Sequence, residues 1–495
     1  MKKYDLVVVG SGAGFIVLDA ALERGLQCAL IEKDQLGGTC LNRGCIPSKM
    51  LVYPADLIRE AQRSDKVGVS FGKPKADWKK IGSRMWQQIN QHNNIRRDYE
   101  KVPNLDLYFG TGEFTGRKTM RVKMNEGGWS QAFEADKFVL AAGARSKVPD
   151  IEGLQEAECL TYETFFGDKF PKTPWKSLII IGGGVIGTEF AHIFSAMGTK
   201  VTVIGRAPHL LRGEEEEVSE AVEDQFRAFG IDMLLGHAAI SVKKTKNGKK
   251  VVTRCTRTGK SNTVEAEEVL LASGVTSNAD LLRCDLAGIE VDENGWIVAN
   301  EYMETNQPDI WALGDITGRY QLRHKANYEA DILAGNLFGN GEKRAADYTK
   351  VPWAVFTCPQ VARVGMTEKE AREKGLKVFV GRNDYSQVAS GFAMAYGNGD
   401  VDNGFVKIIA GERGELLGVH IAGYQAAALV QPFVYLMNAA TIPHVHGDHL
   451  HYSVGTFEPI LQSMVIHPAL SELTAWALDN IDWLVGEQEN EALRG

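Results

Sequence analysis

Two stretches of the chain share one order of apolar and glycine positions. An apolar run at residues 6–9 ends at Gly10, and a second apolar run follows at 28–32 after a helix-like stretch. The segment 178–204 repeats this order. Each stretch predicts a strand, a glycine turn, a helix and a second strand. Continuous apolar strands are typical of a parallel sheet covered on both faces, so we expect two dinucleotide-type domains.

The remaining segments carry shorter patterns. Residues 239–272 alternate between apolar and polar positions around Asn247-Gly248 and Gly259, which predicts hairpins. From about residue 345 the pattern becomes mixed, with a helix expected over 367–374 and a strand near residue 420. The expected fold class is α/β, with two Rossmann-like dinucleotide-binding domains and a C-terminal α+β domain. The expected domain ranges are 1–150 and 273–344 for the two parts of the first dinucleotide-binding domain, 151–272 for the second, and 345–495 for the C-terminal domain.

Composition and charge exclude several classes of function. The 495 residues include 55 Lys and Arg against 63 Asp and Glu, a net charge of −8. The absence of a basic excess disfavours a nucleic-acid partner and a polybasic membrane anchor. Every stretch of 18 residues that is otherwise apolar contains a charged residue, so we expect no membrane span. The first apolar run is too short for a signal peptide, so we expect a cytoplasmic protein. Seven cysteines are too few, and odd in number, for a disulfide scaffold.

The first glycine turn has the chemistry of a dinucleotide site. Gly10 and Gly12 let the backbone approach a pyrophosphate at a helix N-terminus, and Glu32 at the end of the next strand can bind a ribose hydroxyl. Phe15 stands where the third glycine of the motif is usual, so a local shift in packing is expected. Another apolar strand ends at Gly143, a further candidate at this site. The alternative interpretation of the turn at Gly10 and Gly12 is a simple strand–helix turn.

The second glycine turn carries the complete motif, Gly182, Gly184 and Gly187. The acidic residue expected after its second strand is replaced by Arg206, and Arg212 follows. Arginines bind a 2′-phosphate bidentately, whereas a carboxylate repels one, so NADPH is favoured over NADH. The alternative is that the two arginines only neutralise the acidic run at 214–217.

A cysteine pair lies in the segment Gly-Gly-Thr-Cys-Leu-Asn-Arg-Gly-Cys-Ile-Pro-Ser-Lys, residues 37–49. Residues five apart on a regular helix have Cα atoms about 8–9 Å apart, whereas a disulfide needs roughly 4.4–6.8 Å. If Cys40 and Cys45 pair, the helix must therefore break between them, and Gly44 and Pro47 are the candidate breakers. A helix start also lowers a thiolate pKa. The alternatives are two unpaired structural thiols or a metal site, although the local sequence offers no further ligands.

This segment resembles the signature of the group I flavoprotein disulfide reductases. The resemblance continues through residues 310–315, 354–359 and 467–472 and covers nearly the whole chain. Residues 277–282 and 420–425 are most similar to mycothione reductase and to archaeal dihydrolipoamide-dehydrogenase-like proteins. Residues 273–278 depart from the family pattern, because its usual arginine and proline are missing. The absence of a C-terminal cysteine pair and of an N-terminal metal-binding domain disfavours mercuric reductase.

The resemblance implies cofactors and an assembly. It implies FAD, held by Gly10, Gly12, Glu32, Gly143 and Asp315, together with a pyridine nucleotide. It also implies that the C-terminal domain is a dimerisation domain, so that the protein is a homodimer with a small disulfide or dithiol substrate.

The resemblance also implies roles in catalysis. Cys45 would lie against the flavin as the charge-transfer thiolate, and Cys40 would be the interchange thiol. Lys49 and Glu189 would form an ion pair beside the flavin. The acid–base residue would be His467, oriented by Glu472 and directed at the cysteines of the other subunit. Disulfide exchange independently requires such a proton donor, and histidine titrates in the right range.

A histidine-rich segment, residues 444–451, reproduces the H-x-H-x-D-H pattern of zinc metallohydrolases. No other metallohydrolase motif accompanies it, so we interpret it as a solvated loop and expect no metal site.

The predicted function is an NADPH-driven, FAD-dependent reductase of a low-molecular-weight disulfide. The first alternative is dihydrolipoyl dehydrogenase, which works towards NAD⁺. A more distant alternative is a non-catalytic flavin- or metal-binding paralogue.

Overall fold

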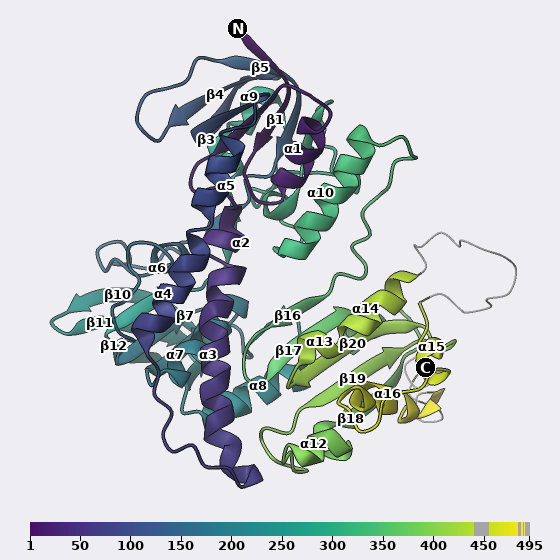
Figure 1. Ribbon diagram of the computed structural model, residues 1–495. Helices are drawn as coiled ribbons and strands as arrows, with labels where there is room; N and C mark the ends of the chain where they lie inside the picture. The colour runs from purple at the N-terminus through teal and green to yellow at the C-terminus, as the bar shows by residue number, and fades with distance from the viewer. Residues whose placement is uncertain (440–454, 484–486, 489, 491–495) are drawn as a thin grey trace, which may run out of the picture.

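The structure is a computed structural model that describes residues 1–439, 455–483, 487, 488 and 490. It confirms the expected α/β class. Two parallel sheets with helices on their faces are joined to a C-terminal antiparallel sheet (Figure 1). In the described part of the chain, no helix is both long and apolar enough to cross a bilayer.

The N-terminal sheet is centred on two parallel strands, β1 and β5. Strand β2 pairs with the other edge of β1, β3 pairs with β2, and β15 joins β5, all in parallel. Helices α1, α5 and α10 surround this sheet (Figure 1). The strands are β1 (Lys2–Val9), β2 (Cys28–Glu32), β3 (Leu105–Gly116), the antiparallel β4 (Thr119–Met124), β5 (Phe133–Leu140) and β15 (Ile310–Ala312). The helices are α1 (Gly14–Leu22), α5 (His92–Tyr99) and α10 (Arg323–Phe338).

The second parallel sheet has the order β13-β7-β8-β9. A separate antiparallel sheet, β10-β11-β12, follows it and forms the two predicted hairpins. The strands are β7 (Ser177–Ile181), β8 (Lys200–Gly205), β9 (Asp232–Leu235), β10 (His237–Thr245), β11 (Gly248–Cys255), β12 (Ser261–Ala266) and β13 (Glu268–Leu271). The helices in this part of the chain are α6 (Tyr162–Phe165), α7 (Val185–Ala196) and α8 (Glu216–Ala228).

A small two-stranded ladder forms where residues 273–278 depart from the family pattern. Strands β6 (Ala144–Ser146) and β14 (Val275–Ser277) pair antiparallel there. Arg145 donates to the carbonyl oxygen of Ser277 at 2.7 Å and forms an ion pair with Asp280 at 2.7 Å. An arginine from the neighbouring strand therefore supplies the cation that this segment lacks.

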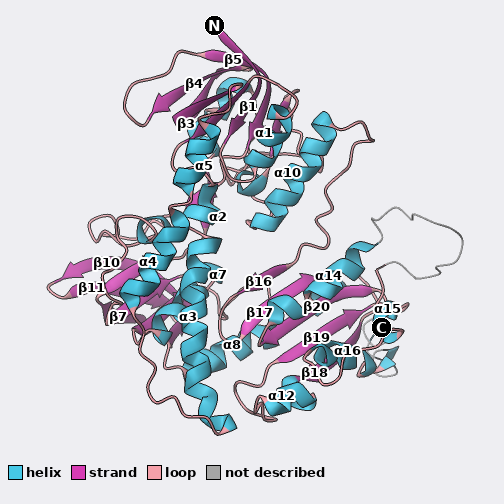
Figure 2. Ribbon diagram, viewed as in Figure 1, coloured by secondary structure: helices cyan, strands magenta, loops and turns pink. Residues whose placement is uncertain are grey.

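The C-terminal sheet is antiparallel, in the order β16-β17-β20-β19-β18. Short helices lie around it, as the cyan ribbons of Figure 2 show. The strands are β16 (Trp353–Val355), β17 (Gln360–Gly365), β18 (Phe379–Asp384), β19 (Phe405–Ala410) and β20 (Leu416–Gly423). The helices are α11 (Glu368–Glu373), α12 (Ala389–Ala393), α13 (Ala426–Leu429), α14 (Gln431–Asn438), α15 (Glu458–Leu461) and α16 (Ser471–Asp479).

A column of helices joins the two parallel sheets (Figure 1). It consists of α2 (Gly38–Asn42), α3 (Cys45–Arg63) and α4 (Trp78–Ile89), and a single turn, α9 (Cys284–Ala287), packs on β3. Trp78 on α4 stacks on Phe170 with ring centroids 5.2 Å apart and also contacts Phe194 on α7. This buried aromatic cluster fixes α3 and α4 against the second sheet, and so positions the segment that carries the cysteines.

Candidate active site

The cysteine pair lies where helix α2 gives way to helix α3. Cys40 is on α2, and Cys45 is the first residue of α3. The break is at Arg43 and Gly44, whose backbone angles are not helical. The predicted break is therefore present, but Pro47 does not form it: Pro47 is buried in the first turn of α3, where proline is tolerated.

The two thiols differ strongly in acidity. Both are unpaired, with Cys45 exposed and Cys40 half-buried. The hydrogen bond from Cys40 and the charge of Lys49 lower the pKa of Cys45 to about 7. The same hydrogen bond, together with burial, raises the pKa of Cys40 well above its ordinary value. In the dithiol form, Cys45 is thus the thiolate near neutral pH and Cys40 keeps its proton.

The Lys49 ammonium is held one turn beyond Cys45. Its Nζ lies 2.8 Å from both carboxylate oxygens of Glu189 on α7, and the Glu189 side chain is only 7% exposed. The backbone N–H of Phe356 donates to Glu189 at 3.0 Å, and Lys49 lies over the Phe356 ring, 4.3 Å from its centroid. Phe356 lies in the segment 354–359 that resembles the family, but the sequence analysis gave it no role at this site.

The first glycine turn follows β1 closely. Gly10 has φ +100°, and a Cβ there would lie 2.3 Å from the carbonyl oxygen of Ala141. A Cβ on Gly14 would lie 2.8 Å from Val8. Gly14 therefore provides the close helix–strand packing expected of the third glycine, and Phe15 is free to stack on Tyr99 at 4.6 Å.

The Glu32 carboxylate lies beside this turn. One oxygen accepts from the backbone N–H of Ser11 at 2.9 Å and from its hydroxyl at 2.6 Å, and the other accepts from the N–H of Asp34 at 2.9 Å. The N–H of Gly37, at the start of the cysteine segment, donates to the Ser11 hydroxyl at 3.0 Å. Ser11 thus ties the glycine turn, the acidic residue and the cysteine segment together, a role that the sequence analysis missed.

Asp315 lies in a 3₁₀ turn, η3 (Gly314–Thr317), just before α10. Burial raises its pKa, and the charges of Lys325 and Arg323 oppose that shift. Glu329 accepts from the N–H of Gly314 at 2.7 Å and pairs with Lys325 at 3.2 Å, with both side chains 1% exposed. This buried pair, also missed from the sequence, fixes the turn that presents Asp315.

These residues fit FAD. The turn at Gly10 and Gly12 leaves room for a pyrophosphate next to the N-terminus of α1, and a Cβ on Gly12 would meet only Arg323, at 3.6 Å. Glu32 keeps unused lone pairs for a ribose hydroxyl. Gly143 has φ +69° and open space around it.

The second glycine turn has the tight geometry that its motif predicts. A Cβ on Gly182 would lie 2.0 Å from the carbonyl oxygen of Ala272, and one on Gly187 would lie 2.0 Å from that of Gly182. Gly184 is the N-cap residue of α7. Substitution of either tight glycine would force the turn apart.

Arg206 and Arg212 lie exposed after β8. Within the described residues neither has an ion-pair partner. In the acidic run at 214–217, three of the four carboxylates pair instead with Arg363, Lys407 and Arg382 of the C-terminal sheet. The fourth, Glu216, approaches His209 at 3.5 Å. The alternative that the two arginines neutralise this run is therefore wrong.

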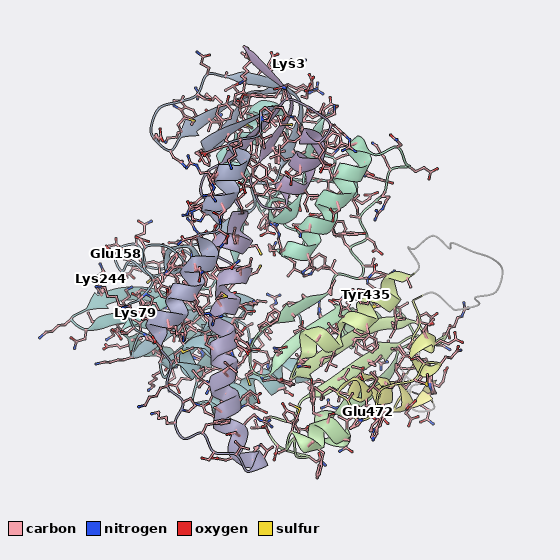
Figure 3. All side chains as sticks on the ribbon, in the orientation of Figure 1. Lys3, Lys79, Glu158, Lys244, Tyr435 and Glu472 are labelled. Carbon is pink, nitrogen blue, oxygen red and sulfur yellow. The ribbon has the colours of Figure 1, made fainter. Side chains whose placement is uncertain are left out.

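His467 and Glu472 form the expected close pair. The Nδ1 atom of His467 is 2.6 Å from a Glu472 oxygen, and the N–H of Ala469 donates to the other oxygen at 3.1 Å. The His467 side chain is 67% exposed, whereas that of Glu472 is 3% exposed. Glu472 lies on the C-terminal sheet's outer side, far from α2 (Figures 1 and 3). The two residues therefore do not reach the cysteines of their own chain.

Metal ligation has no support in the described residues. They contain no group of three or more His, Cys, Asp or Glu side chains placed to hold a metal ion. The histidine-rich segment at 444–451 lies outside the described residues.

The chain belongs to the pyridine nucleotide-disulphide oxidoreductases. Residues 4–330 match the model of that family, and residues 351–478 match its dimerisation domain. The resemblance to group I flavoprotein disulfide reductases is thus confirmed, and so is the expectation of an enzyme. Enzymes of this family use FAD and a pyridine nucleotide.

Individual relatives are similar over nearly their full length. Mycothione reductase of Mycobacterium tuberculosis (strain H37Rv) is 34% identical over 490 residues, covering 97% of this chain and 99% of the relative. Dihydrolipoyl dehydrogenase of Haloferax volcanii is 31% identical over 483 residues, covering 96% of each. The Cu(II) complex of the HOCl-induced flavoprotein disulfide reductase RclA from Escherichia coli is a structural neighbour, with TM-score 0.81, 27% identity, and 97% of this chain and 99% of that chain covered.

Proposed function

We propose that this chain is an NADPH-dependent reductase of a low-molecular-weight disulfide. The observation that carries the proposal is the difference in acidity between Cys40 and Cys45, held at a helix break beside the Lys49–Glu189 pair. A disulfide reductase needs one stable thiolate and one thiol that exchanges with substrate, and two unpaired structural thiols have no need of that difference.

The first glycine turn, Glu32, Gly143 and Asp315 would hold FAD. FAD bound there would supply two-electron transfer between the nicotinamide and the cysteine disulfide. Reduction leaves a thiolate on Cys45, stabilised by the Cys40 hydrogen bond and by Lys49, and a protonated thiol on Cys40.

Cys40 then exchanges with the substrate RS–SR. A base removes the Cys40 proton, the Cys40 sulfur attacks one substrate sulfur, and RS⁻ leaves and takes up that proton. The Cys45 thiolate next attacks the Cys40 sulfur, which restores the intramolecular disulfide and releases the second RS⁻. The sum is NADPH, one proton and RSSR giving NADP⁺ and two RSH.

We assign the base to His467 of the partner subunit. The His467–Glu472 pair lies away from the cysteines of its own chain, its imidazole is exposed, and the chain carries the family's dimerisation domain. The buried Glu472 carboxylate holds Nδ1, so Nε2 is left to accept and return the proton. The active unit is then a homodimer.

NADPH is proposed over NADH because of Arg206 and Arg212. Both guanidinium groups are exposed beside the second glycine turn, and the nearby acidic run is paired elsewhere. They are therefore available to a 2′-phosphate. In the Arg206→Ala/Arg212→Ala double variant, the KM for NADPH should rise while that for NADH stays constant. An unchanged KM for NADPH would overturn the cofactor assignment.

Dihydrolipoyl dehydrogenase is the second candidate. Several relatives carry that name at similar identity, such as that of Bacillus subtilis, 32% identical over 431 residues. It would use the same cysteines in the opposite direction and reduce NAD⁺.

One assay separates the two candidates. NADPH and NADH oxidation is measured against lipoamide, oxidised glutathione, mycothione disulfide, bis-γ-glutamylcystine and cystine. Rapid NADPH turnover with one small thiol disulfide supports the proposal, and rapid NADH-linked lipoamide turnover supports the dehydrogenase. Anaerobic addition of NADPH provides the second readout: a long-wavelength charge-transfer band is expected, and a flavin that bleaches without it would contradict the role of Cys45.

A further inference from the structure

The loop that carries Arg206 and Arg212 is attached to the protein at two places. On one side, the N–H of Leu211 donates to the carbonyl oxygen of Gly183, in the second glycine turn, at 2.9 Å. On the other side, Arg363 donates from Nη1 to the carbonyl oxygen of Gly213 at 2.6 Å. Arg363 belongs to β17, in the C-terminal sheet, so a residue outside the nucleotide-binding sheet contacts the backbone immediately after Arg212.

Arg363 is the first member of a basic row across the C-terminal sheet. It is paired in register with His420 on β20, His420 is paired with Lys407 on β19, and Lys407 is paired with Arg382 on β18. Directly paired residues of antiparallel strands point to the same face of a sheet. The four side chains therefore form one line, which we call the basic row.

The basic row faces the acidic run at the start of α8. Glu214 approaches Arg363 at 3.6 Å and His420 at 3.5 Å. Lys407 pairs with Glu215 at 3.0 Å and with Glu217 at 2.7 Å, and Arg382 pairs with Glu217. Helix α8 accordingly lies against this sheet in Figure 1. The acidic run thus docks the start of α8, which follows the nucleotide loop, on the C-terminal sheet.

Burial makes this contact sensitive to the loss of Arg363. The Glu214 side chain is fully buried and neither of its oxygens has a hydrogen-bond partner, so it depends on the charge of Arg363, 3.6 Å away. Lys407 is 9% exposed at its side chain. Because these charged side chains are shielded from water, their ion pairs are strong and hold the start of α8 in one position on the sheet.

We propose that Arg363 is a positioning residue for Arg212, so that the C-terminal sheet sets how tightly the enzyme holds the 2′-phosphate of NADPH. The inference rests on the proposed NADPH preference. In this proposal Arg363 acts through the loop backbone and not on the nucleotide itself. It fixes the Gly213 carbonyl, and with it the backbone from which the Arg212 guanidinium extends. Gly213 has φ +100°, so this loop end depends on external contacts to hold its conformation.

The proposal predicts which kinetic constant changes. Loss of the anchor lets Arg212 sample other positions, which weakens only the contact with the 2′-phosphate. In Arg363→Ala the KM for NADPH should rise about three- to tenfold. A charge-assisted hydrogen bond from Arg212 to the 2′-phosphate would contribute roughly tenfold or more to affinity, and loss of the anchor weakens that bond without removing it. The KM for NADH and both kcat values should stay constant. The inhibition constant of 2′,5′-ADP should rise with the KM for NADPH, and that of 5′-AMP should not.

Three further variants serve as controls for Arg363→Ala. Arg382→Ala removes the other end of the basic row, which does not contact the loop, and should leave the KM for NADPH unchanged. Arg363→Lys restores a cation and should recover part of the affinity. If Arg363→Ala folds poorly because Glu214 is left buried and unpaired, Arg363→Ala/Glu214→Gln removes that charge. It should still show the raised KM, because the Gly213 contact is lost.

The outcomes distinguish this inference from the function on which it rests. If Arg206→Ala/Arg212→Ala removes NADPH preference but Arg363→Ala leaves it intact, the anchoring role is wrong and the cofactor assignment stands. If neither variant changes the preference, the cofactor assignment fails first. A parallel rise in the KM for both nucleotides would show a general loss of structure and would also contradict the specific role of Arg363.

Discussion

The Nζ atom of Lys49 lies 2.8 Å from both oxygens of Glu189 and beside the Cys45 thiol, whose pKa it helps to lower to about 7. The pair joins two distant segments, because Lys49 is on α3 and Glu189 is on α7. Burial opposes the effect of Lys49, and so does the charge of Glu189, because both raise the pKa of Cys45. The hydrogen bond from Cys40 is the largest influence on the pKa of Cys45, and the ion pair that the two helices place beside it adjusts that pKa further.

Lys49→Met should raise the pKa of Cys45 by about one unit, the scale of a nearby opposite charge, and Glu189→Gln should lower it. The measurement is thiolate absorbance of the reduced protein against pH. Because Lys49→Met leaves a buried carboxylate unpaired, the Lys49→Met/Glu189→Gln double variant serves as the folded reference. Equal pKa values in all three variants would show that the pair does not act on the thiol.

Hydrogen bonds with Thr258 lower the pKa of Cys255 to about 7 as well, so the titration and its variants are made in a Cys255→Ser background. In that background the reduced protein should titrate one thiolate near neutral pH. Since the pKa of Cys45 is lowered to about 7, its thiolate is present above that pH and is lost as the pH falls through it. Cys40→Ala removes the hydrogen-bond donor and should move this midpoint upward, whereas Cys45→Ala should remove the low-pKa titration. The rate of alkylation by iodoacetamide against pH reports the same midpoint. A low midpoint that persists in Cys45→Ala would assign the thiolate to another residue.

His467→Ala should lower kcat for disulfide reduction by roughly 10²–10⁴-fold, the usual contribution of a general acid–base group. Glu472→Gln should lower it less, because the histidine remains but loses its charged partner. The hydrogen bond from His467 lowers the pKa of Glu472, so the carboxylate is ionised throughout the assay range.

Mixed dimers test where His467 acts. Inactive His467→Ala and Cys45→Ala chains are unfolded together and reassembled. A heterodimer then contains one site with both cysteines and a histidine from the other chain. Partial recovery of activity is expected, and complete inactivity of verified heterodimers would place the histidine and cysteines of one site on the same chain.

Glu329→Ala should weaken FAD retention and lower stability by about 3–5 kcal/mol, because the buried Lys325 ammonium loses its partner. The same change frees the N–H of Gly314, next to Asp315. Tyr348→Phe is the matched control, since the tyrosine hydroxyl donates only one hydrogen bond to Glu329, at 2.7 Å, and its loss should reduce stability by about 1 kcal/mol. Thermal melting and flavin fluorescence on dilution measure the two effects. Similar melting for both variants would contradict the role given to the Lys325–Glu329 pair.

The sequence alone indicated the elements whose information is local. The apolar runs before Gly10 and Gly182 predicted the two strand–turn–helix units, and the hairpin at Gly248 was also predictable. The spacing of Cys40 and Cys45 predicted a helix break if the two cysteines pair, and the structure has that break at Arg43 and Gly44. Local backbone sterics and periodicity fix these features without reference to the rest of the chain.

The tertiary structure decided what depends on residues far apart. It assigned the acidic run at 214–217 to the C-terminal sheet rather than to Arg206 and Arg212, and it gave the packing role expected of position 15 to Gly14. It also brought Lys49, Glu189 and Phe356 together and separated His467 from the cysteines of its own chain. Charge pairing and burial depend on distance in space, and no local pattern records which distant segment will supply the opposite charge.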